Sequence, residues 1–497
     1  MIISTHPDNI SYTNSWPEMA GDAEGNTYVV WQGSDGNDSE VYWVKIDASG
    51  TPGQVQKIST HPEGESYDDQ YPQIAVDSSG NSCVTWFGSD GNDTEIYWVK
   101  VDESGTPGQV HKISTHPENT IHGDWNPQIA VDGSGNSYVT WEGSDGNDRD
   151  IYWVKVDESG DLGEVLKVSD HPDNMQHDDL DPQIAVDASG NSYVVWHGCD
   201  KENCEEKPGD FEIYWVRIDS EGVPGTAKKV PPTNPDNINI MAMVPQLAVD
   251  VQGNSYIVWS GINEKSNDIY WVKIDTSGKL GTILRISARP NSNYGDYHPR
   301  ICVDASGNSY VTWCGSEGKY ADVYWVRIDS KGTLGAVQKI SNYLFNERHA
   351  DSDSRIAVDS SGNSYVTWNS CNVESGERFD QKICWVKIGT EGKPGRAQNI
   401  STYPISKHFD GNSQIAVDSK GNSYVVWEGK DASKHDHIYF TASLSNQGLS
   451  TSLTIVITLV IVTIIAIVVE IRRKKSKISL RSNRQDNIQN LQRKQKK

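Results

Sequence analysis

The segment IAVDSSGNSYVTW at residues 356–368 decides the fold, because it recurs with small changes eight times along the chain. The glycine at its centre falls at positions 25, 80, 135, 190, 253, 307, 362 and 421. Successive glycines are therefore 55, 55, 55, 63, 54, 55 and 59 residues apart. A period near 55 residues, repeated eight times, is typical of an array of equal structural units or of a propeller.

Each unit predicts four short strands separated by turns. In the third copy we expect strands at 127–131 (PQIAV), 137–141 (SYVTW), 150–156 (DIYWVKV) and 164–168 (EVLKV). The segments after the first and third strands are rich in Gly, Asn and Asp, which suit tight turns. No helical period separates the strands, which excludes a fold that alternates strands and helices. We therefore predict an all-β fold, an eight-bladed β-propeller of four-stranded antiparallel blades.

Tryptophan supports the propeller. Eight tryptophans end the second strands, seven more lie in the third strands, and together they make up 15 of the 17 in the chain. Large aromatic side chains at such regular positions indicate packing between neighbouring blades rather than an aromatic ligand cage.

The two ends of the propeller fit a closed ring. The last copy has three strands, ending near Phe440, while IISTHP at residues 2–7 matches the end of a fourth strand, as in ISTHP at 58–62. We expect the N-terminal residues to complete the eighth blade and leave no open edge. Residues 1–7 are too short and polar for a signal peptide, and the equivalents of 54–57 are missing. We therefore expect a signal peptide and a few strand residues upstream.

Charge divides the chain in two. The formal net charge of −24 combines −33 over residues 1–469 with +9 over residues 470–497. The main body has no concentrated basic face, so we do not expect a nucleic acid partner.

The charge boundary coincides with an apolar run at 453–469, which is followed by the basic residues RRKK at 472–475. As a helix rising 1.5 Å per residue, this run covers about 26 Å, which is a short but sufficient bilayer span. The alternative is a helix buried in a protein core. The basic end is expected in the cytoplasm. We predict a propeller ectodomain at 1–445, a linker at 446–452, a transmembrane α-helix at 453–471 and a disordered cytoplasmic tail at 472–497 that contacts anionic lipid. This arrangement describes a single-pass protein of the cell membrane with its propeller outside.

The pattern PQIAVDxxGNSYVxW, followed by GSDGNDxxIYWVKxDxSG, resembles repeats of prokaryotic cell-surface β-propellers, both the SBBP-type repeat and the sialidase-like BNR repeat. The resemblance covers roughly residues 1–443. It implies a surface propeller of a class that includes binding modules and glycosidases. The Asp-box order of sialidases, Ser-x-Asp-x-Gly-x-x-Trp, is not reproduced here.

The loops that precede the first strand and follow the second are expected on one acidic face. Three residues before the Pro or Ser of the first strand, six copies carry an aspartate: Asp69, Asp124, Asp179, Asp296, Asp351 and Asp410. A ring of carboxylates near the mouth of a central channel could hold Ca²⁺. The alternative is that each carboxylate accepts hydrogen bonds from amides of its own turn.

Arginines distinguish two neighbouring copies. Arg300 and Arg355 stand where five other copies have Gln, and the preceding loops contribute Arg289 and Arg348. These four side chains could form a fork for a carboxylate, sulfate or phosphate group of a ligand. The alternative is that they neutralise nearby aspartates.

Cysteines occur in two of the longer loops between the second and third strands. We predict disulfides between Cys199 and Cys204 and between Cys371 and Cys384, in agreement with an external location. A metal site at the first pair is the alternative.

These features predict a non-catalytic binding or adhesion module for glycans, surface-layer components or protein partners. The alternative is an extracellular, sialidase-like glycoside hydrolase, for which arginines and carboxylates are present but no motif gives them roles.

Overall fold

The computed structural model describes residues 1–4, 13–34, 36–60, 67–114, 123–144, 146, 148–169, 178–199, 211–230, 240–262, 267–287, 295–316, 320–341, 349–372, 381–401, 409–431 and 435–443. The predicted linker at 446–452, transmembrane helix at 453–471 and tail at 472–497 lie outside these residues. Within them, no helix has the length and apolar character needed to cross a bilayer.

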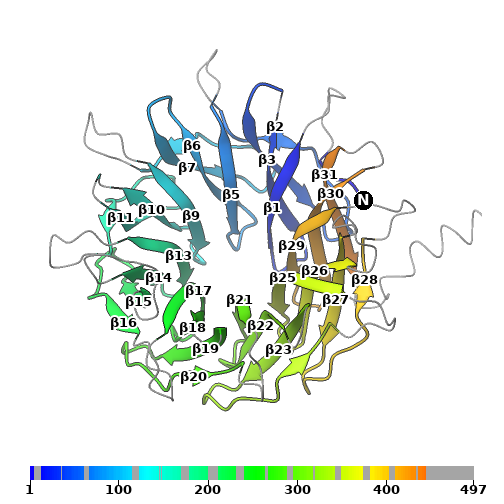
Figure 1. Cartoon of the computed structure of the whole chain (residues 1–497). Coiled ribbons are helices and arrows are strands. Elements are labelled where there is room, and N and C mark those ends of the chain that lie inside the picture. Colours follow the sequence, from blue (N-terminus) through cyan, green and yellow to red (C-terminus); the bar gives the residue numbers. More distant parts are fainter. Residues whose placement is uncertain are drawn as a thin grey trace, which may run out of the picture. The chain divides into compact units, whose positions relative to one another are not determined.

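The described chain forms eight consecutive antiparallel sheets, which confirms the eight-bladed propeller with four-stranded blades. Blade one is β1–β4 and the other blades follow in chain order. The first strand of each blade lies nearest the axis, as Figure 1 shows. These inner strands are β1 (Asn14–Gly21), β5 (Asp69–Val76), β9 (Asp124–Val131), β13 (Asp179–Val186), β17 (Met241–Val249), β21 (Asp296–Val303), β25 (His349–Val358) and β29 (Asp410–Val417).

The second and third strands are long and regular, and the fourth are short. The second strands are β2 (Thr27–Ser34), β6 (Ser82–Ser89), β10 (Ser137–Ser144), β14 (Ser192–Cys199), β18 (Ser255–Ile262), β22 (Ser309–Ser316), β26 (Ser364–Asn372) and β30 (Ser423–Lys430). The third are β3 (Ser39–Ile46), β7 (Thr94–Val101), β11 (Arg149–Val156), β15 (Phe211–Ile218), β19 (Asn267–Ile274), β23 (Ala321–Ile328), β27 (Gln381–Ile388) and β31 (Asp436–Ser443). The fourth are β4 (Gln56–Lys57), β8 (His111–Lys112), β12 (Leu166–Lys167), β16 (Lys228–Val230), β20 (Leu284–Arg285), β24 (Gln338–Lys339) and β28 (Gln398–Asn399).

The strands of the third copy differ in length from the prediction, and β10 and β11 run three residues and one residue longer than the expected 137–141 and 150–156. The fourth strand expected at 164–168 is reduced to β12, because the chain first forms a separate bridge between Val156 and Leu162 and joins the sheet regularly only afterwards. The inner strand expected at 127–131 begins three residues earlier, at Asp124. A β-bulge lies within this extension, and Pro127 follows it. Because proline usually stands at the start of a strand or at a bulge, the sequence suggested that the strand begins at Pro127.

The N-terminus closes the ring, as predicted. Blade eight has the strands β29–β31, and Ile2 bridges Tyr439 of β31 in antiparallel fashion. The Ile3 amide donates to the Ile438 carbonyl at 2.9 Å. Ser4 Oγ accepts the Ile438 amide at 2.9 Å, as serines two residues after the fourth strand do in other blades. The first four residues thus act as the fourth strand of blade eight.

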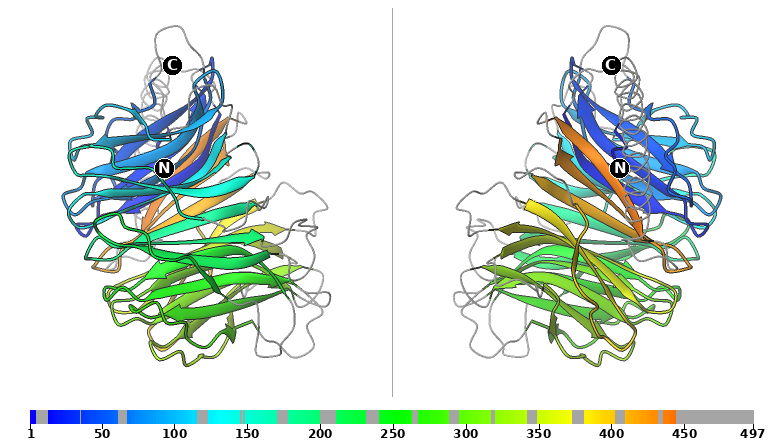
Figure 2. Two further views of the ribbon diagram at one scale, coloured as in Figure 1. Left: turned by 90° about the vertical axis from the view of Figure 1, so that its left-hand side faces the viewer. Right: turned by 90° about the vertical axis from the view of Figure 1, so that its right-hand side faces the viewer.

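Neighbouring blades pack face to face, as the side views in Figure 2 show. One core cluster joins Tyr28 and Trp43 of blade one to Val84 and Trp86 of blade two, all at most 2% exposed. The regular tryptophans are therefore packing residues, and truncating one to alanine typically costs about 3–5 kcal/mol.

The turn between the first and second strands explains why the Asp, Gly and Asn of the segment DxxGN recur in every copy of the repeat. In blade three, Asp132 accepts hydrogen bonds from the Asn136 amide at 3.0 Å and from the Tyr138 hydroxyl at 2.8 Å. The turn glycine of the next blade, Gly190, has φ +79° and lies against that same hydroxyl. A Cβ there would approach Tyr138 Oη to 3.0 Å, so glycine serves both the turn and the contact between blades.

Candidate functional site around the propeller axis

The six predicted aspartates are buried inside their own blades. Each is 0 or 1% exposed at or near the start of its inner strand. Asp69 accepts a hydrogen bond from Trp86 Nε1 at 2.8 Å, and Asp124 accepts one from Trp141 Nε1 at 3.0 Å. In blade one, Asn14 accepts the Trp31 indole in the same way at 2.8 Å. In five blades this position thus satisfies a buried indole donor, through Asn14, Asp69, Asp124, Asp179 and Asp296.

The structure does not group these aspartates with one another. Among the described residues, potential metal ligands gather within 4.8 Å of one another in two places, at Asp90, Asp93 and Glu95 and at Asp431, His435 and His437. None of the six aspartates belongs to either group.

A residue with a left-handed backbone interrupts every inner strand. These eight bulge residues have φ between 49° and 53°: Trp16, Tyr71, Asn126, Asp181, Val244, His298, Asp353 and Asn412. A non-glycine residue pays about 1–2 kcal/mol for this conformation. Because all eight blades share the bulge, its backbone is a structural feature, and only the side chain that it presents differs between blades.

Two bulge residues form an exposed aromatic surface on blades one and two. Trp16 and Tyr71 are 43% and 39% exposed, and their rings lie 4.9 Å apart at 41°. Tyr71 also stacks on Phe87, with centroids 5.4 Å apart and planes at 16°. We call Trp16, Tyr71 and Phe87 the aromatic platform. The Trp16 amide donates to Glu428 at 3.1 Å, which ties the platform to blade eight.

Two residues beyond each bulge, the inner strands carry a ring of polar side chains. This axial ring consists of Glu18, Gln73, Gln128, Gln183, Gln246, Arg300, Arg355 and Gln414. Arg355 Nε donates to Gln414 Oε1 at 3.2 Å, and Gln414 Nε2 donates to Glu18 Oε1 at 2.8 Å. A hydrogen bond also joins Glu18 to Gln73. Four successive blades are thus linked side chain to side chain around the axis.

The charges of the axial ring are concentrated in one sector. Glu18 keeps some contact with solvent, yet desolvation raises its pKa to about 7, against the opposing attraction of Arg355 and Arg300. Desolvation and then repulsion from Arg355 lower the pKa of Arg300 to about 9, while Glu18 and Asp353 raise it. The two predicted arginines are therefore neighbours, and the carboxylates of Glu18 and Asp353 act on them. Arg289 and Arg348 lie outside the described residues.

A second group of titratable side chains lies at the bulges of blades three and four. Glu142 accepts hydrogen bonds from the Asp181 amide at 2.7 Å and from Asn126 Nδ2 at 2.9 Å. His197 Nδ1 lies 3.7 Å from Asp181 Oδ2, and burial lowers the pKa of this histidine. These contacts couple two blades and place Asp181 beside a buried imidazole.

The prediction missed the platform and Glu18, although the sequence contains a signal for each. Trp16 and Trp125 are the two tryptophans outside the packing positions, and both precede the proline of an inner strand. Glu18 replaces the Gln of other copies, just as Arg300 and Arg355 do.

One predicted disulfide is wrong. Cys199 is disulfide-bonded, and Cys204 lies outside the described residues. Cys371 and Cys384 are thiols. In the β26–β27 ladder Cys384 pairs with Trp368, three positions from Cys371. That offset corresponds to about 10 Å along the strands, beyond the reach of a disulfide.

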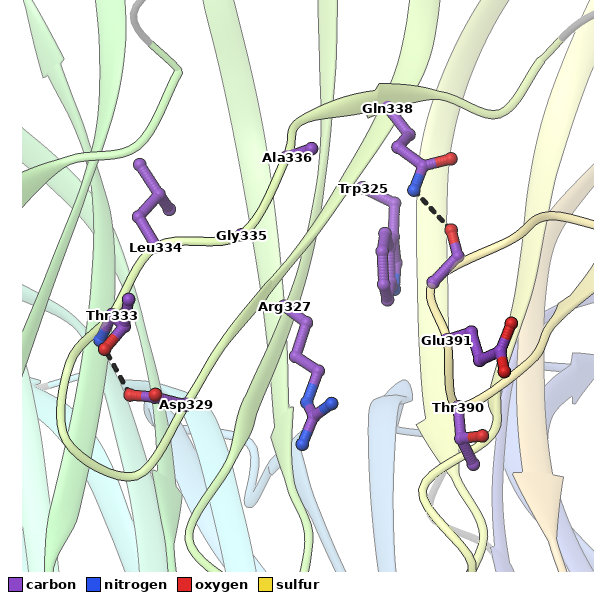
Figure 3. A pocket seen from close by; sticks show the side chains of 11 residues that line it. Trp325, Arg327, Asp329, Thr333, Leu334, Gly335, Ala336, Gln338, Thr390 and Glu391 are labelled. Atoms are coloured by element: carbon purple, nitrogen blue, oxygen red, sulfur yellow. Dashed lines mark hydrogen bonds between the residues drawn. The ribbon is translucent and has the colours of Figure 1, made fainter.

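Cavities of similar lining lie between neighbouring blades on the opposite side, at the turns that follow the third strands. Figure 3 shows the one between blades six and seven, about 440 Å³ in volume, with Trp325, Arg327, Asp329 and Gln338 in its wall. Equivalent cavities of about 450 and 400 Å³ precede it along the ring. Because their lining repeats with the blades, we interpret them as a result of blade packing.

Comparison with known proteins finds similar solved structures but no matching family. No protein-family model and no curated protein matches the chain. Similar solved structures include the WD40 domain of SCAP from fission yeast, at 12% identity and TM-score 0.48, covering 89% of this chain and 97% of that one. Others are the polysaccharide lyase Uly1, at 9% identity and TM-score 0.46 over 78% of this chain and 90% of that one, and the Trypanosoma rangeli sialidase, at 11% identity and TM-score 0.37 over 69% and 57%.

Proposed function

We propose that this protein is a non-catalytic glycan-binding module, held at the cell surface, that binds its ligand at the axial end carrying the aromatic platform. The observation that carries the proposal is the exposed pair of Trp16 and Tyr71 on two neighbouring blades. Contiguous exposed apolar surfaces mark binding sites, and the flat faces of aromatic rings suit the apolar face of a sugar ring.

The polar groups near the platform suit the rest of a glycan. Gln73 and Glu18 follow Tyr71 and Trp16 by two residues in their inner strands and offer hydrogen bonds to hydroxyl groups. The neighbouring guanidinium groups of Arg300 and Arg355 suit a carboxylate or sulfate substituent. These features together favour an acidic glycan.

A glycan array probed with the full-length chain tests the proposal. Replacing both Trp16 and Tyr71 with alanine should lower binding at least tenfold, because both stacking faces are lost. Replacing Leu162, which is 40% exposed at a turn of blade three, is the matched control and should leave binding unchanged. Undiminished binding by the double variant would contradict the proposal.

Glu18 favours a second candidate function, a glycoside hydrolase. A carboxyl group with a pKa of about 7 can act as a general acid near neutral pH. A panel of fluorogenic glycosides decides between the two functions. Turnover that is lost in Glu18→Gln would establish the enzyme, whereas binding without turnover supports the module.

We also propose that residues 453–471 anchor the propeller to the cell membrane with the basic tail inside. The support is the uncharged apolar run followed by four basic residues. Deleting 453–469 should release the protein from the membrane fraction, and retention of the deleted chain there would contradict the anchor.

A further inference from the structure

Among the described residues, blade eight carries a cluster of one aspartate and two histidines. Asp431, after β30, and His435 and His437, before and within β31, bring three ligand atoms within 4.8 Å of one another. Asp431 Oδ2 lies 3.4 Å from His437 Nε2 and 3.8 Å from His435 Nδ1. The three side chains thus converge on one point.

Local structure explains this convergence. His435 and His437 are two residues apart in extended chain, so their side chains project from the same face. The Asp431 amide donates to the His435 carbonyl at 3.0 Å, and Asp431 Oδ1 accepts the His435 amide at 3.0 Å. These bonds fix the turn and leave Oδ2 directed at the imidazoles.

The closure of the ring removes the usual partner of the His437 position. In blades one to six this position in the third strand holds a carboxylate that pairs with a lysine or arginine of the fourth strand, as Glu95 pairs with Lys112 at 2.5 Å, and blade seven has Lys382 there. In blade eight the fourth strand is the N-terminus, and Ile2 pairs with Tyr439 where Lys112 pairs with Tyr97. A carboxylate would have no such lysine, and His437 replaces it.

His437 is oriented as a metal ligand would be. Its Nδ1 lies 3.5 Å from Ser4 Oγ, so its other nitrogen, Nε2, faces Asp431. Histidines that bind metals usually use the second ring nitrogen for such a contact, which fixes the ring.

We propose that Asp431 Oδ2, His435 Nδ1 and His437 Nε2 bind Zn²⁺ at the closure of the propeller. Zinc bonds to nitrogen and oxygen of about 2.0–2.1 Å place tetrahedral ligands about 3.3 Å apart. The observed 3.4 and 3.8 Å are close to that spacing. Two imidazoles select zinc over calcium, which prefers oxygen ligands. Three protein ligands leave a fourth position for water.

The other cluster of potential ligands already holds a cation. Asp90 and Glu95 both contact the Lys112 ammonium, at 3.2 and 2.5 Å. Near the proposed site, the Lys430 ammonium pairs with Asp436 at 2.5 Å. Asp431 and its two histidines are therefore the favoured place for a metal among the described residues.

Zinc at this site would connect the turn after β30 to the strand that receives the N-terminus, because His437 contacts Ser4. We therefore expect zinc to stabilise the closure of the ring, where Ile3 and Phe440 form the backbone bonds to the opposite strand.

Zinc titration of the chelator-treated full-length chain, with a chromophoric chelator as competitor, tests the proposal. We expect one Zn²⁺ per chain with submicromolar affinity. His435→Ala should weaken it at least 100-fold without unfolding the protein, because this side chain is 43% exposed. His111→Ala, in β8 of blade two, belongs to neither cluster; it is the control and should bind normally.

Hydrogen exchange supplies a second measurement. Zinc should slow exchange of the Ile3 and Phe440 amides in the wild-type chain and leave it unchanged in His435→Ala. Absence of stoichiometric zinc binding, equal binding by His435→Ala, or a site that takes calcium in preference to zinc would overturn the proposal.

Discussion

Replacing Asp124 with alanine should destabilise the propeller far more than replacing it with asparagine. Asp124 is 0% exposed and accepts the indole N–H of Trp141, itself 1% exposed, at 3.0 Å. Leaving a buried donor without its acceptor costs about 1–3 kcal/mol. The vacated volume adds about 1 kcal/mol. The alanine variant should therefore lose about 2–4 kcal/mol of the free energy of unfolding.

Asparagine keeps the acceptor oxygen, and Asn14 already fills this role at 2.8 Å in blade one, so the asparagine variant should lose less than about 1 kcal/mol. Urea unfolding followed by tryptophan fluorescence measures both changes. Equal losses in the two variants would refute the reasoning, because charge rather than the indole contact would then matter. A shift of the wild-type midpoint on removal of calcium would favour the calcium hypothesis for this position instead.

Three further changes test the fold and the axial ring. Ile3→Ala should cost about 2–4 kcal/mol in urea unfolding, because Ile3 is 2% exposed in the closing strand, whereas Ile2→Ala, at 38% exposed, should cost less than about 1 kcal/mol; similar losses would contradict closure by the N-terminus. Glu18 has a folded pKa of about 7 against an ordinary value of 4.5, so the unfolded state releases its proton first and stability should fall as pH rises from about 4.5 to about 7. The thermal midpoint of Glu18→Gln should not show this fall in stability between about pH 4.5 and 7. If the variant has the same pH profile as the wild-type chain, Glu18 does not cause the fall. Gly143→Ala places a Cβ against Asp124 Oδ1 and 2.8 Å from the Tyr152 ring, and it should lower the free energy of urea unfolding by about 1–3 kcal/mol. Gly133→Ala, whose Cβ meets nothing within 4 Å, is the control; equal stability of the two variants would show that both neighbours can move aside.

Much of the fold is predictable because the chain contains eight copies of the same structural unit. The strand boundaries would be ambiguous in a single copy. Aligning the copies shows which positions keep the same residue and which positions vary. The match between residues 2–7 and 58–62 predicts closure for the same reason, and the Ile2–Tyr439 bridge confirms it. The short fourth strands were not predictable, since a β-rich pattern does not reveal where pairing between strands begins.

The chemistry of the site was harder to predict, because a residue's surroundings come from other strands. Asp124 stands in a polar segment and suggested an exposed ligand, yet the indole of Trp141 on the adjacent strand makes it a buried acceptor. Cys371 and Cys384 border one loop, but the register of their strands sets them apart. Arg300 and Arg355 were predictable as neighbours, because equivalent positions of consecutive blades meet around an axis.

The same geometry suggests where function arises in such a ring. A side chain repeated in all eight blades is explained by contacts that every blade needs, as for the bulge backbone or the Asp132 turn. A ligand breaks that equivalence, so the residues that bind it must differ between copies. Glu18 and the two arginines do so within the axial ring, and His437 does so where the chain must close on itself. We therefore look for binding residues at the positions where a copy departs from the repeat, since the repeated residues are already explained by packing.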